Sequence, residues 1–402
     1  MATTGACQPP RQAKHPGSEN MDSRSPRAHP GEGDLHLSRI LHPVADAAFS
    51  LLDDRPVLFC ESTQKLYELN QLGAYIWCCL LDKKPVEAIC EDLTTSGLHQ
   101  LEASKYVRQA LLNWFELGLL KADWKICKEH SFVASLGKFA VNIQTSGEQL
   151  TQLLLPLFSQ ISATESADDI FEVIEVDQLI HVFHNKTCAF RCGSNQLAPT
   201  MKAYITEQIV QRSSPDVVFH AACLLFEGKS LLVSGRPGAG KTTLALHLME
   251  AGFDYGADDI VFIAPDGSAM GVPFAPALKP GSWAMVKRFR PDLGEAVVHC
   301  RPDGKRVRYL KTPRTAPKGT SPVAWIVFIK RAPNGPAKLT PIGQLETMSR
   351  LIDGSFSPVG KLTYQGFNAL KRTLTNANSF ELQYSDVAQA RDTIVALCNG
   401  KL

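Results

Sequence analysis

The sequence predicts an α/β domain built around a strand, a glycine-rich loop and a helix, preceded by a small α+β domain of winged-helix type. Three observations carry this prediction. An apolar run, a glycine-rich loop and a helical pattern follow one another at 231–252. Two adjacent aspartates stand shortly after them, at 258 and 259. Nearer the start, at 36–125, two short extended runs precede three amphipathic helical patterns.

Length and composition are those of a globular chain. With 402 residues, there is room for two or three domains of about 100–200 residues each. Apolar residues make up 44%, charged residues 20%, and the net charge is only +2, which gives no sign of a nucleic-acid or membrane-surface binder. No segment approaches the roughly 18 consecutive apolar residues of a membrane span. Residues 1–35 are rich in Pro, Gly, Ser and charge, so we expect a disordered tail there and no secretory signal.

The cysteine pattern favours reduced thiols in a cytoplasmic protein. There are 11 cysteines, with no CxxC pair and no spacing typical of a zinc site. Cys188 and Cys192, with His181 and His184, come nearest to such a spacing. Buried thiols are the favoured interpretation of that group, and a metal site is the alternative.

The first folded block is expected at 36–125. The runs "PVLFCES" and "KLYELN" predict two strands, with a turn at 61–64. The stretches "QLGAYIWCCLL", "KPVEAICEDLTTSG" and "LEASKYVRQALLNWFELGLL" then place apolar residues at helical spacing. Gly97 and Gly118 mark the ends of the second and third helices. Two strands followed by three helices form a winged-helix arrangement.

The rest of the chain divides at about residue 220. In 126–219, "SFVASLGKFAVNIQ" and "FEVIEVDQLIHVFHN" predict strands, the second with a turn near Asp177 and Gln178, and "MKAYITEQIVQRS" predicts a helix. From 220 to 402 a strand–loop–helix–strand order takes over. The final "FELQYSDVAQARDTIVALC" predicts a strand followed by a helix. The predicted domains are therefore 36–125, 126–219 and 220–402.

The segment 235–242 has the spacing G-x-x-x-x-G-K-[ST] of a phosphate-binding loop. Glycines let backbone N–H groups turn toward phosphate oxygens, and the next helix directs its N-terminus at the anion. The Lys241 charge would meet the outer phosphates, and the Thr242 hydroxyl would bind Mg²⁺. The apolar strand "SLLVSG" and the helix "TTLALHLMEAG" flank the loop as this geometry requires. The predicted nucleotide contacts are Gly235, Arg236, Pro237, Gly238, Ala239, Gly240, Lys241, Thr242 and Thr243.

Asp258 and Asp259 come one helix and one strand after the loop. Two carboxylates beside Mg²⁺ suit two tasks, since one can hold the metal while the other accepts a proton from an attacking hydroxyl. A turn-forming pair of aspartates is the alternative interpretation. His220 follows the apolar run "VVF", where a structural histidine is the more common case.

His220, the loop and the two aspartates, in this order and at these separations, resemble HPr kinase/phosphorylase and the HPr-kinase-related proteins of peptide-modification clusters. The resemblance covers roughly residues 130–400, including "PALKPGSW" and "KRVRYL". It implies a P-loop kinase fold akin to phosphoenolpyruvate carboxykinase, which transfers the γ-phosphoryl of ATP to a serine hydroxyl. The glycine-rich signature that follows the catalytic region in true HPr kinases has no counterpart here. That absence argues against phosphorolysis and against HPr itself as the substrate.

The resemblance also implies roles for individual residues and two cofactors, ATP and Mg²⁺. Thr242 and Asp258 would hold the metal, and Asp259 would be the base toward the serine, although the division between the two aspartates stays open. Lys279 in "PALKPGSW" would be a further phosphate contact, and a homo-oligomer is compatible with the family. The catalytic residues implied in this way are Asp258, Asp259, His220 and Lys241.

Residues 39–125 resemble PqqD, the small domain that binds leader peptides of ribosomally made, post-translationally modified peptides, known as RiPPs, which include the lasso type. The stretches "VLFCESTQKLYELNQLGAYIWCCL" and "LLNWFELGLLK" carry this resemblance. Such domains add the leader as a strand at a sheet edge beside the third helix. The implied partner is a RiPP precursor peptide, and the implied contacts are Lys65, Leu66, Tyr67, Glu68, Leu69, Lys105 and Arg108.

This block has two competing interpretations. One is a winged-helix DNA-binding domain, and the other is a module that serves only packing or dimerisation. Between Arg39 and Lys125 there are nine Lys or Arg against twelve Asp or Glu. Because an acidic block binds a phosphate backbone poorly, peptide recognition is favoured, with no nucleic acid and no membrane as partner.

Together, these features predict an ATP-dependent serine kinase that modifies a ribosomally made precursor peptide recruited by its first domain. A P-loop protein that has lost phosphoryl transfer and acts as a nucleotide-gated peptide chaperone is one alternative. A kinase for a serine of an HPr-like protein is another. Residues 279–318 hold eleven Lys or Arg and three Asp or Glu. A solvated basic face is favoured there over a segment that closes on the ligand.

Overall fold

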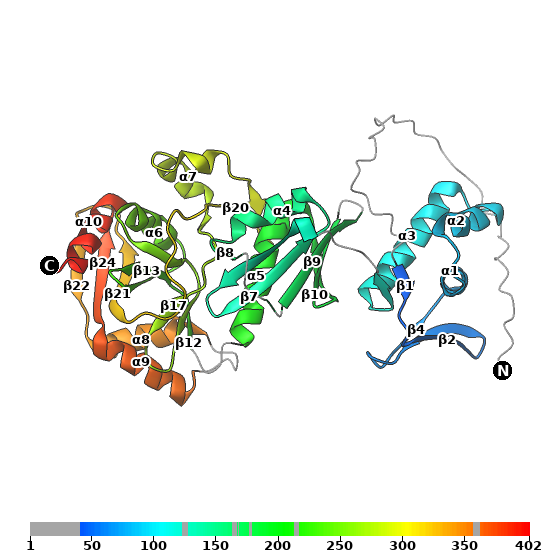
Figure 1. The fold of residues 1–402 in the computed structure, drawn as a ribbon, viewed down its shortest axis with the longest axis horizontal. Coiled ribbons are helices and arrows are strands. Elements are labelled where there is room, and N and C mark those ends of the chain that lie inside the picture. The colour runs from blue at the N-terminus through cyan, green and yellow to red at the C-terminus, as the bar shows by residue number, and fades with distance from the viewer. Residues whose placement is uncertain are drawn as a thin grey trace. The chain divides into compact units, whose positions relative to one another are not determined.

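Several sheets and helices make up a mixed α/β fold (Figure 1). The computed structural model describes residues 41–122, 128–162, 167, 169–176, 179–212, 217–356 and 362–402. Contacts divide the chain into two units. The first contains residues up to Cys127 and Ile174–Arg191, and the second contains Lys128–Val173 and Cys192–Leu402. The predicted tail at 1–35 and the predicted turn at 177–178 lie outside the described residues.

The first unit contains an antiparallel sheet in the order β2 (Ala47–Leu52), β3 (Arg55–Cys60), β4 (Lys65–Glu68). Strands β3 and β4 match the two extended runs, but the sequence analysis does not predict β2, because "AAFSLL" lacks a regular apolar–polar alternation. The overlooked signal is the turn: Asp53 and Asp54 have φ of 49° and 60°, as a two-residue hairpin turn requires. A short pair, β1 (Leu41–Pro43) with β5 (Leu120–Ala122), joins the two ends of this part of the chain.

Three helices follow in the predicted order: α1 (Gln71–Leu81), α2 (Val86–Thr95) and α3 (Gln100–Glu116). The Asn70 side chain caps α1 by accepting a hydrogen bond of 2.7 Å from the Gly73 N–H. Trp77 is fully buried and meets the Trp114 ring edge-on, with centroids 5.1 Å apart. The inner face of the β2–β3–β4 sheet therefore closes a core of aromatic and aliphatic side chains.

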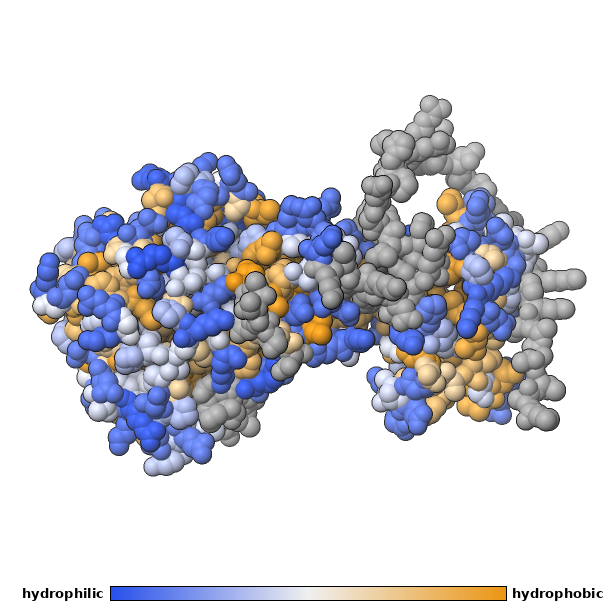
Figure 2. Space-filling view, in the orientation of Figure 1, coloured by the Kyte–Doolittle hydropathy of each residue, from blue (hydrophilic) through white to orange (hydrophobic). Residues whose placement is uncertain are grey.

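The outer face of that sheet carries exposed apolar side chains. Phe59 and Leu66 lie opposite each other in β3 and β4 and are 39% and 56% exposed. Figure 2 shows apolar residues gathered over these strands.

Strands β10 (Leu179–His184) and β11 (Thr187–Cys192) are neighbours in a sheet. Phe183 packs on Phe115 of α3, with ring centroids 5.1 Å apart, which explains why this hairpin belongs to the first unit. His181 is buried here, and burial lowers its pKa. Within the described ranges, no group of three or more His, Cys, Asp or Glu residues is placed to hold a metal.

The second unit begins with the predicted hairpin of β6 (Ser131–Leu136) and β7 (Phe139–Thr145). Strand β8 (Ile161–Ser162) pairs antiparallel with β6, and β9 (Asp169–Val176) pairs parallel with β7. The short α4 (Glu148–Leu154), which was not expected, contacts the predicted helix α5 (Leu197–Gln211). Helix α5 buries Met201, Ile205 and Ile209, so one of its faces is anchored in the core.

A six-stranded sheet forms the centre of the second unit. Its order is β15 (Asp254–Ala257), β13 (Ala222–Phe226), β14 (Lys229–Ser234), β21 (Val323–Arg331), β24 (Asn378–Tyr384), β22 (Lys338–Pro341). Strands β14, β21 and β24 run parallel to one another. Their carboxyl ends therefore meet at one edge of the sheet, where β14 leads into the glycine-rich loop.

Helices cover the central sheet on both faces (Figure 1). Helices α6 (Lys241–Glu250) and α10 (Val387–Cys398) pack on one face, around a core that includes Val233 and Leu382. Helices α8 (Gln344–Asp353) and α9 (Tyr364–Asn376) share the core of the other face with a second sheet. That sheet has the order β17 (Ala269–Gly271), β16 (Val261–Ile263), β12 (Val217–Phe219), β23 (Ser355–Phe356).

The basic segment 279–318 is built into the fold by local contacts. It contains α7 (Pro280–Val286), β19 (His299–Cys300) and β20 (Arg306–Tyr309), and β20 pairs with β18 (Ala277–Leu278). The Arg308 guanidinium lies 4.5 Å from the centre of the Trp283 ring and donates to the Leu293 carbonyl at 2.8 Å. Single turns of 3-10 helix lie at Lys128–His130, Leu155–Leu157, Ser194–Gln196 and Pro291–Gly294.

Leu382 tests the core beneath α6 and α10, because it is fully buried in β24 of the central sheet. We expect Leu382→Ala to lower the free energy of unfolding by about 2–5 kcal/mol. The matched control, Leu345→Ala, removes a side chain that is 88% exposed and should change stability by less than about 0.5 kcal/mol. Urea denaturation followed by circular dichroism measures both, and equal effects would contradict this description of the core.

Candidate functional site

The glycine-rich loop lies between the end of β14 and the start of α6. Gly238 and Gly240 have φ of +86° and +99°, a region that side chains with a Cβ rarely adopt. At Gly235, a Cβ would lie 2.7 Å from the Ile329 carbonyl oxygen of β21. The loop is therefore held close to the neighbouring strand. Arg236 and Pro237 are exposed at its tip, whereas Ala239 and Thr243 are buried.

Tyr384, at the end of β24, holds the glycine-rich loop in place through its side chain. Its hydroxyl donates a 2.7 Å hydrogen bond to the Ala239 carbonyl and would lie 2.5 Å from a Cβ on Gly240. The Arg331 guanidinium stands 5.1 Å from the centre of the Tyr384 ring. Sequence reasoning missed this contact, because 145 residues separate the two partners and neither belongs to a local motif.

Lys241 is 8% exposed and donates a 2.8 Å hydrogen bond from Nζ to the Gly235 carbonyl. Burial lowers its pKa, and the nearby positive charge of Lys279 adds to that effect, while Asp258 and Asp259 oppose it. Lys279 itself is exposed just before α7. The two lysines thus lie within electrostatic reach of each other, and their contacts to phosphate stay predictions.

Thr242 and Asp258 are brought together under the loop. The Thr242 hydroxyl donates a 3.0 Å hydrogen bond to Asp258 Oδ2. Asp258 is only 3% exposed, and its Oδ1 is buried with no hydrogen-bond partner, although the backbone N–H of Ala277 lies near the carboxyl group. An unsatisfied buried carboxylate oxygen beside a threonine hydroxyl fits a divalent cation, which prefers oxygen ligands.

Burial, together with repulsion from Asp259, raises the pKa of Asp258 to about 7. The surroundings of this carboxyl group therefore disfavour its ionised form at neutral pH. A bound cation would stabilise that ionised form. Mg²⁺ usually takes one or two protein ligands plus phosphate oxygens. A site with only Thr242 and Asp258 is thus chemically sufficient for it.

Asp259 has a different partner. Its Oδ2 forms an ion pair with Nζ of Lys202 from α5. Burial disfavours the charged form of Asp259, but Lys202 outweighs it, helped by His220 and Lys241, and lowers the pKa to about 2. The Asp259 side chain is 38% exposed, so it remains accessible beside the buried Asp258. The sequence analysis does not predict Lys202, since a lysine in an amphipathic helix is usually a solvated residue.

His220 lies at the end of β12, where its backbone N–H donates to the Gly354 carbonyl at 3.2 Å. Burial lowers the pKa of its ring and Lys241 lowers it further, while Asp259 opposes both, so the imidazole is neutral at pH 7. The structure thus gathers His220, the loop, Lys241, Thr242 and both aspartates. Tyr309, which the sequence analysis also misses, lies within electrostatic reach of Lys202 and Asp259.

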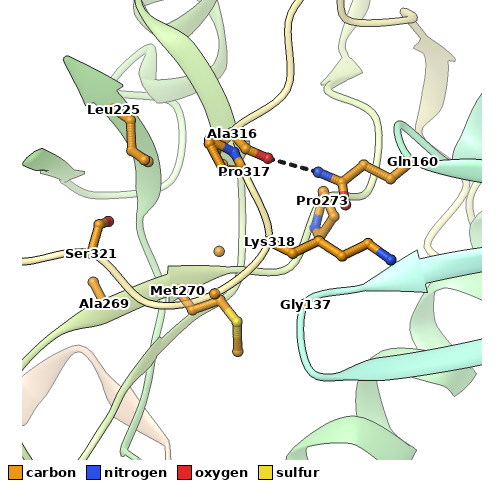
Figure 3. A pocket seen from close by; sticks show the side chains of 13 residues that line it. Gly137, Gln160, Leu225, Ala269, Met270, Pro273, Ala316, Pro317, Lys318 and Ser321 are labelled. Carbon is orange, nitrogen blue, oxygen red and sulfur yellow. Dashed lines mark hydrogen bonds between the residues drawn. The ribbon is translucent and has the colours of Figure 1, made fainter. Parts of the chain in front are cut away.

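Figure 3 shows a small pocket of the second unit that is lined by other residues. Its lining includes Gly137, Gln160, Met270 and Lys318, and Gln160 donates a 3.0 Å hydrogen bond to the Ala316 carbonyl. Neither the loop residues 235–242 nor the two aspartates line it. It therefore has no part in the site described here.

The residues predicted to bind a peptide lie in the first unit. Lys65, Leu66, Tyr67 and Glu68 form β4, which stands at the end of its sheet order, and Leu69 follows it. The Leu69 N–H donates to the Pro56 carbonyl of β3 at 2.8 Å. Because N–H groups alternate in direction along a strand, those of Leu66 and Glu68 point to the open side. Lys105 and Arg108 are exposed on α3.

The comparisons with known proteins give two partial likenesses. No family model matches this chain, and no curated protein matches it. One similar solved structure is TbiB1 in complex with the TbiA(beta) leader peptide, at 20% identity and a TM-score of 0.20, covering 21% of this chain and 99% of that chain. Another is the HPr(Ser) kinase/phosphatase from Coxiella burnetii, at 11% identity and a TM-score of 0.23, covering 46% and 97%. Both TM-scores are low.

Within the described residues, no helix is long and apolar enough to span a membrane.

The pKa of Asp258 predicts a pH dependence of stability in the metal-free protein. Between the ordinary value of 3.8 and about 7, the folded chain holds a proton on Asp258 that the unfolded chain has lost. Lowering the pH from 8 to 6 should therefore stabilise the wild type relative to Asp258→Asn by about 1 kcal/mol. Buried histidines affect both proteins alike, so the difference isolates Asp258. Denaturant titrations at the two pH values measure it, and identical pH slopes would refute the assignment.

Proposed function

We propose that this chain is an ATP-dependent kinase that phosphorylates a serine of a ribosomally made precursor peptide. The observation that carries the proposal is the hydrogen bond between Thr242, which follows the glycine-rich loop, and the buried Asp258. A second carboxylate, Asp259, is accessible next to it. This is the arrangement that phosphoryl transfer needs, because its catalysis is mainly positioning and charge neutralisation.

The residues of the site would divide the work as follows. The loop amides and the N-terminus of α6 receive the phosphate groups, and Lys241 exchanges its bond to the Gly235 carbonyl for a phosphate oxygen. Thr242 and Asp258 would hold Mg²⁺, which when bound neutralises charge on the phosphates. Lys279 and the neutral His220 would contact the transferred group.

Asp259 would act toward the acceptor. It orients the serine hydroxyl and accepts its proton as the serine oxygen bonds to the γ-phosphorus and the bond to the ADP oxygen breaks. Its low pKa makes Asp259 a weak base, which suits a loose transition state in which the hydroxyl is only partly deprotonated. Its 38% exposure leaves room for an acceptor to approach.

The first unit supplies a surface for the acceptor peptide. Strand β4 has outward N–H groups at Leu66 and Glu68, to which an extended peptide can pair as an added strand. Recruitment by a unit of the same chain raises the concentration of the acceptor near the kinase site. The acidic balance of this block favours a peptide over nucleic acid as its ligand.

The kinase proposal predicts a new phosphopeptide. We expect the full chain with Mg-ATP to add one phosphoryl group to a small peptide from its own host. Asp259→Asn should lower the rate of transfer by at least about 100-fold, because the proton acceptor is lost. Mass spectrometry of the peptides measures the transfer.

The control variant is Asp353→Asn, which alters an exposed aspartate at the end of α8 and should leave transfer unchanged. A fluorescent ATP analogue should bind all three proteins with affinities within about threefold. Nucleotide binding without transfer by the wild type would instead support the nucleotide-gated chaperone.

The strand-addition proposal predicts a backbone effect at β4. Leu66→Pro removes an outward N–H without taking a hydrogen bond from the β3–β4 ladder, and edge strands tolerate proline. We expect it to weaken binding of a labelled acceptor peptide by about tenfold, whereas Leu66→Ala keeps the N–H and should bind within about threefold. Fluorescence anisotropy measures both affinities. Equal weakening by the two variants would point to the side chain and against strand addition.

A further inference from the structure

Lys202 reaches the site from α5, a helix that precedes the loop and both aspartates in the chain. Its side chain is only 12% exposed, and its Nζ pairs with Asp259, which lies 57 residues later. The same Nζ lies 5.7 Å from the centre of the Phe274 ring. The buried neighbours Met201 and Ile205 fix the orientation of α5 and so direct Lys202 at Asp259.

We propose that Lys202 is a positioning residue that keeps Asp259 on the acceptor side and away from the metal, so that Asp258 alone serves as the metal-binding carboxylate. The inference rests on the proposed kinase function and settles the division between the two aspartates, which the sequence leaves open. The role of each carboxylate follows from its partner. Asp258 accepts from the Thr242 hydroxyl, which can also bind a cation, and Asp259 pairs with the Lys202 ammonium group.

The electrostatics of the site give Lys202 this role. Two adjacent carboxylates near one dication would both be drawn to it, because each adds a favourable interaction at short range. An ammonium group already bound to Asp259 offsets that attraction and keeps the Oδ2 atom in place. Burying a lysine is costly without a partner, so the ion pair and the orientation of α5 support each other.

An ordinary stabilising ion pair is the competing explanation. A pair that serves only stability would affect folding and not the separate roles of the two carboxylates. A double-mutant cycle distinguishes these cases, because a residue that acts only through Asp259 has no further effect once Asp259 is changed.

The experiment uses the full chain in five forms: wild type, Lys202→Met, Lys202→Arg, Asp259→Asn and the double variant Lys202→Met with Asp259→Asn. Methionine is one atom shorter than lysine and fills a similar volume, but it removes the charge and with it the interaction of Nζ with the Phe274 ring. Transfer to the acceptor peptide gives kcat and the KM for ATP. Electron paramagnetic resonance titration of Mn²⁺, with a non-hydrolysable ATP analogue present, gives metal affinity without any turnover. Thermal melting checks that each variant is folded.

We expect Lys202→Met to lower kcat by about 30-fold with the KM for ATP within about twofold, and Lys202→Arg to recover most of that loss. The double variant should be no slower than Asp259→Asn. Lys202→Met should also bind Mn²⁺ about tenfold more tightly, because Asp259 is released to the metal, and the Asp259→Asn background should remove most of that gain.

Other results would overturn the inference. A kcat that is unchanged in folded Lys202→Met, or a double variant that loses the full factor of each single variant, would show that Lys202 does not act through Asp259. Weaker Mn²⁺ binding in Lys202→Met would mean that Lys202 supports the metal site directly.

If the wild type transfers no phosphate, the proposed function fails, while the Mn²⁺ cycle still decides the role of Lys202. If Lys202→Met unfolds, the Mn²⁺ titrations of Lys202→Arg and Asp259→Asn test the role of Lys202 instead. The inference requires both variants to bind Mn²⁺ within about threefold of the wild type.

Discussion

Repulsion between two adjacent carboxylates is the constraint on which the site depends. Asp258 and Asp259 follow β15 directly, and one of them is almost fully buried. The structure separates them by giving each its own partner: the Thr242 hydroxyl for Asp258 and the Lys202 ammonium for Asp259. Burial and repulsion from Asp259 raise the pKa of Asp258 to about 7, whereas Lys202 outweighs the effect of burial on Asp259 and lowers its pKa to about 2. Two chemically identical side chains can therefore perform different tasks.

The site is assembled from parts of the second unit that lie far apart in the sequence. Parallel β14, β21 and β24 bring the glycine-rich loop, Ile329 and Tyr384 to one edge of the sheet. Tyr384 in β24 hydrogen-bonds to the loop. Lys202 comes from α5, which precedes β14 in the chain, and pairs with Asp259. In the proposed function the loop would bind the phosphate groups, and the surrounding fold places the charged side chains around it.

Local sequence patterns predicted the parts of the molecule that local physics determines. The loop with its strand and helix, and the order of α1, α2 and α3, follow from glycine positions and helical spacing, and the structure contains them. Strand β2 was missed because its apolar residues do not alternate, and Asp53-Asp54 alone marks the turn. Lys202 and Tyr384 could not be predicted, since their roles arise from contacts 57 and 145 residues away along the chain. The domain ranges, nucleotide, metal and peptide remain predictions.

In the proposed site the two aspartates face different ligands, the metal ion for Asp258 and the Lys202 ammonium for Asp259. A crystal structure of the full chain with Mg²⁺ and a non-hydrolysable ATP analogue tests it most directly. We expect a metal ion bound by the Thr242 hydroxyl, Asp258 and phosphate oxygens, with Asp259 still paired to Lys202. A metal ion bound by Asp259, with Lys202 turned away, or a nucleotide bound outside the loop 235–242, would contradict it.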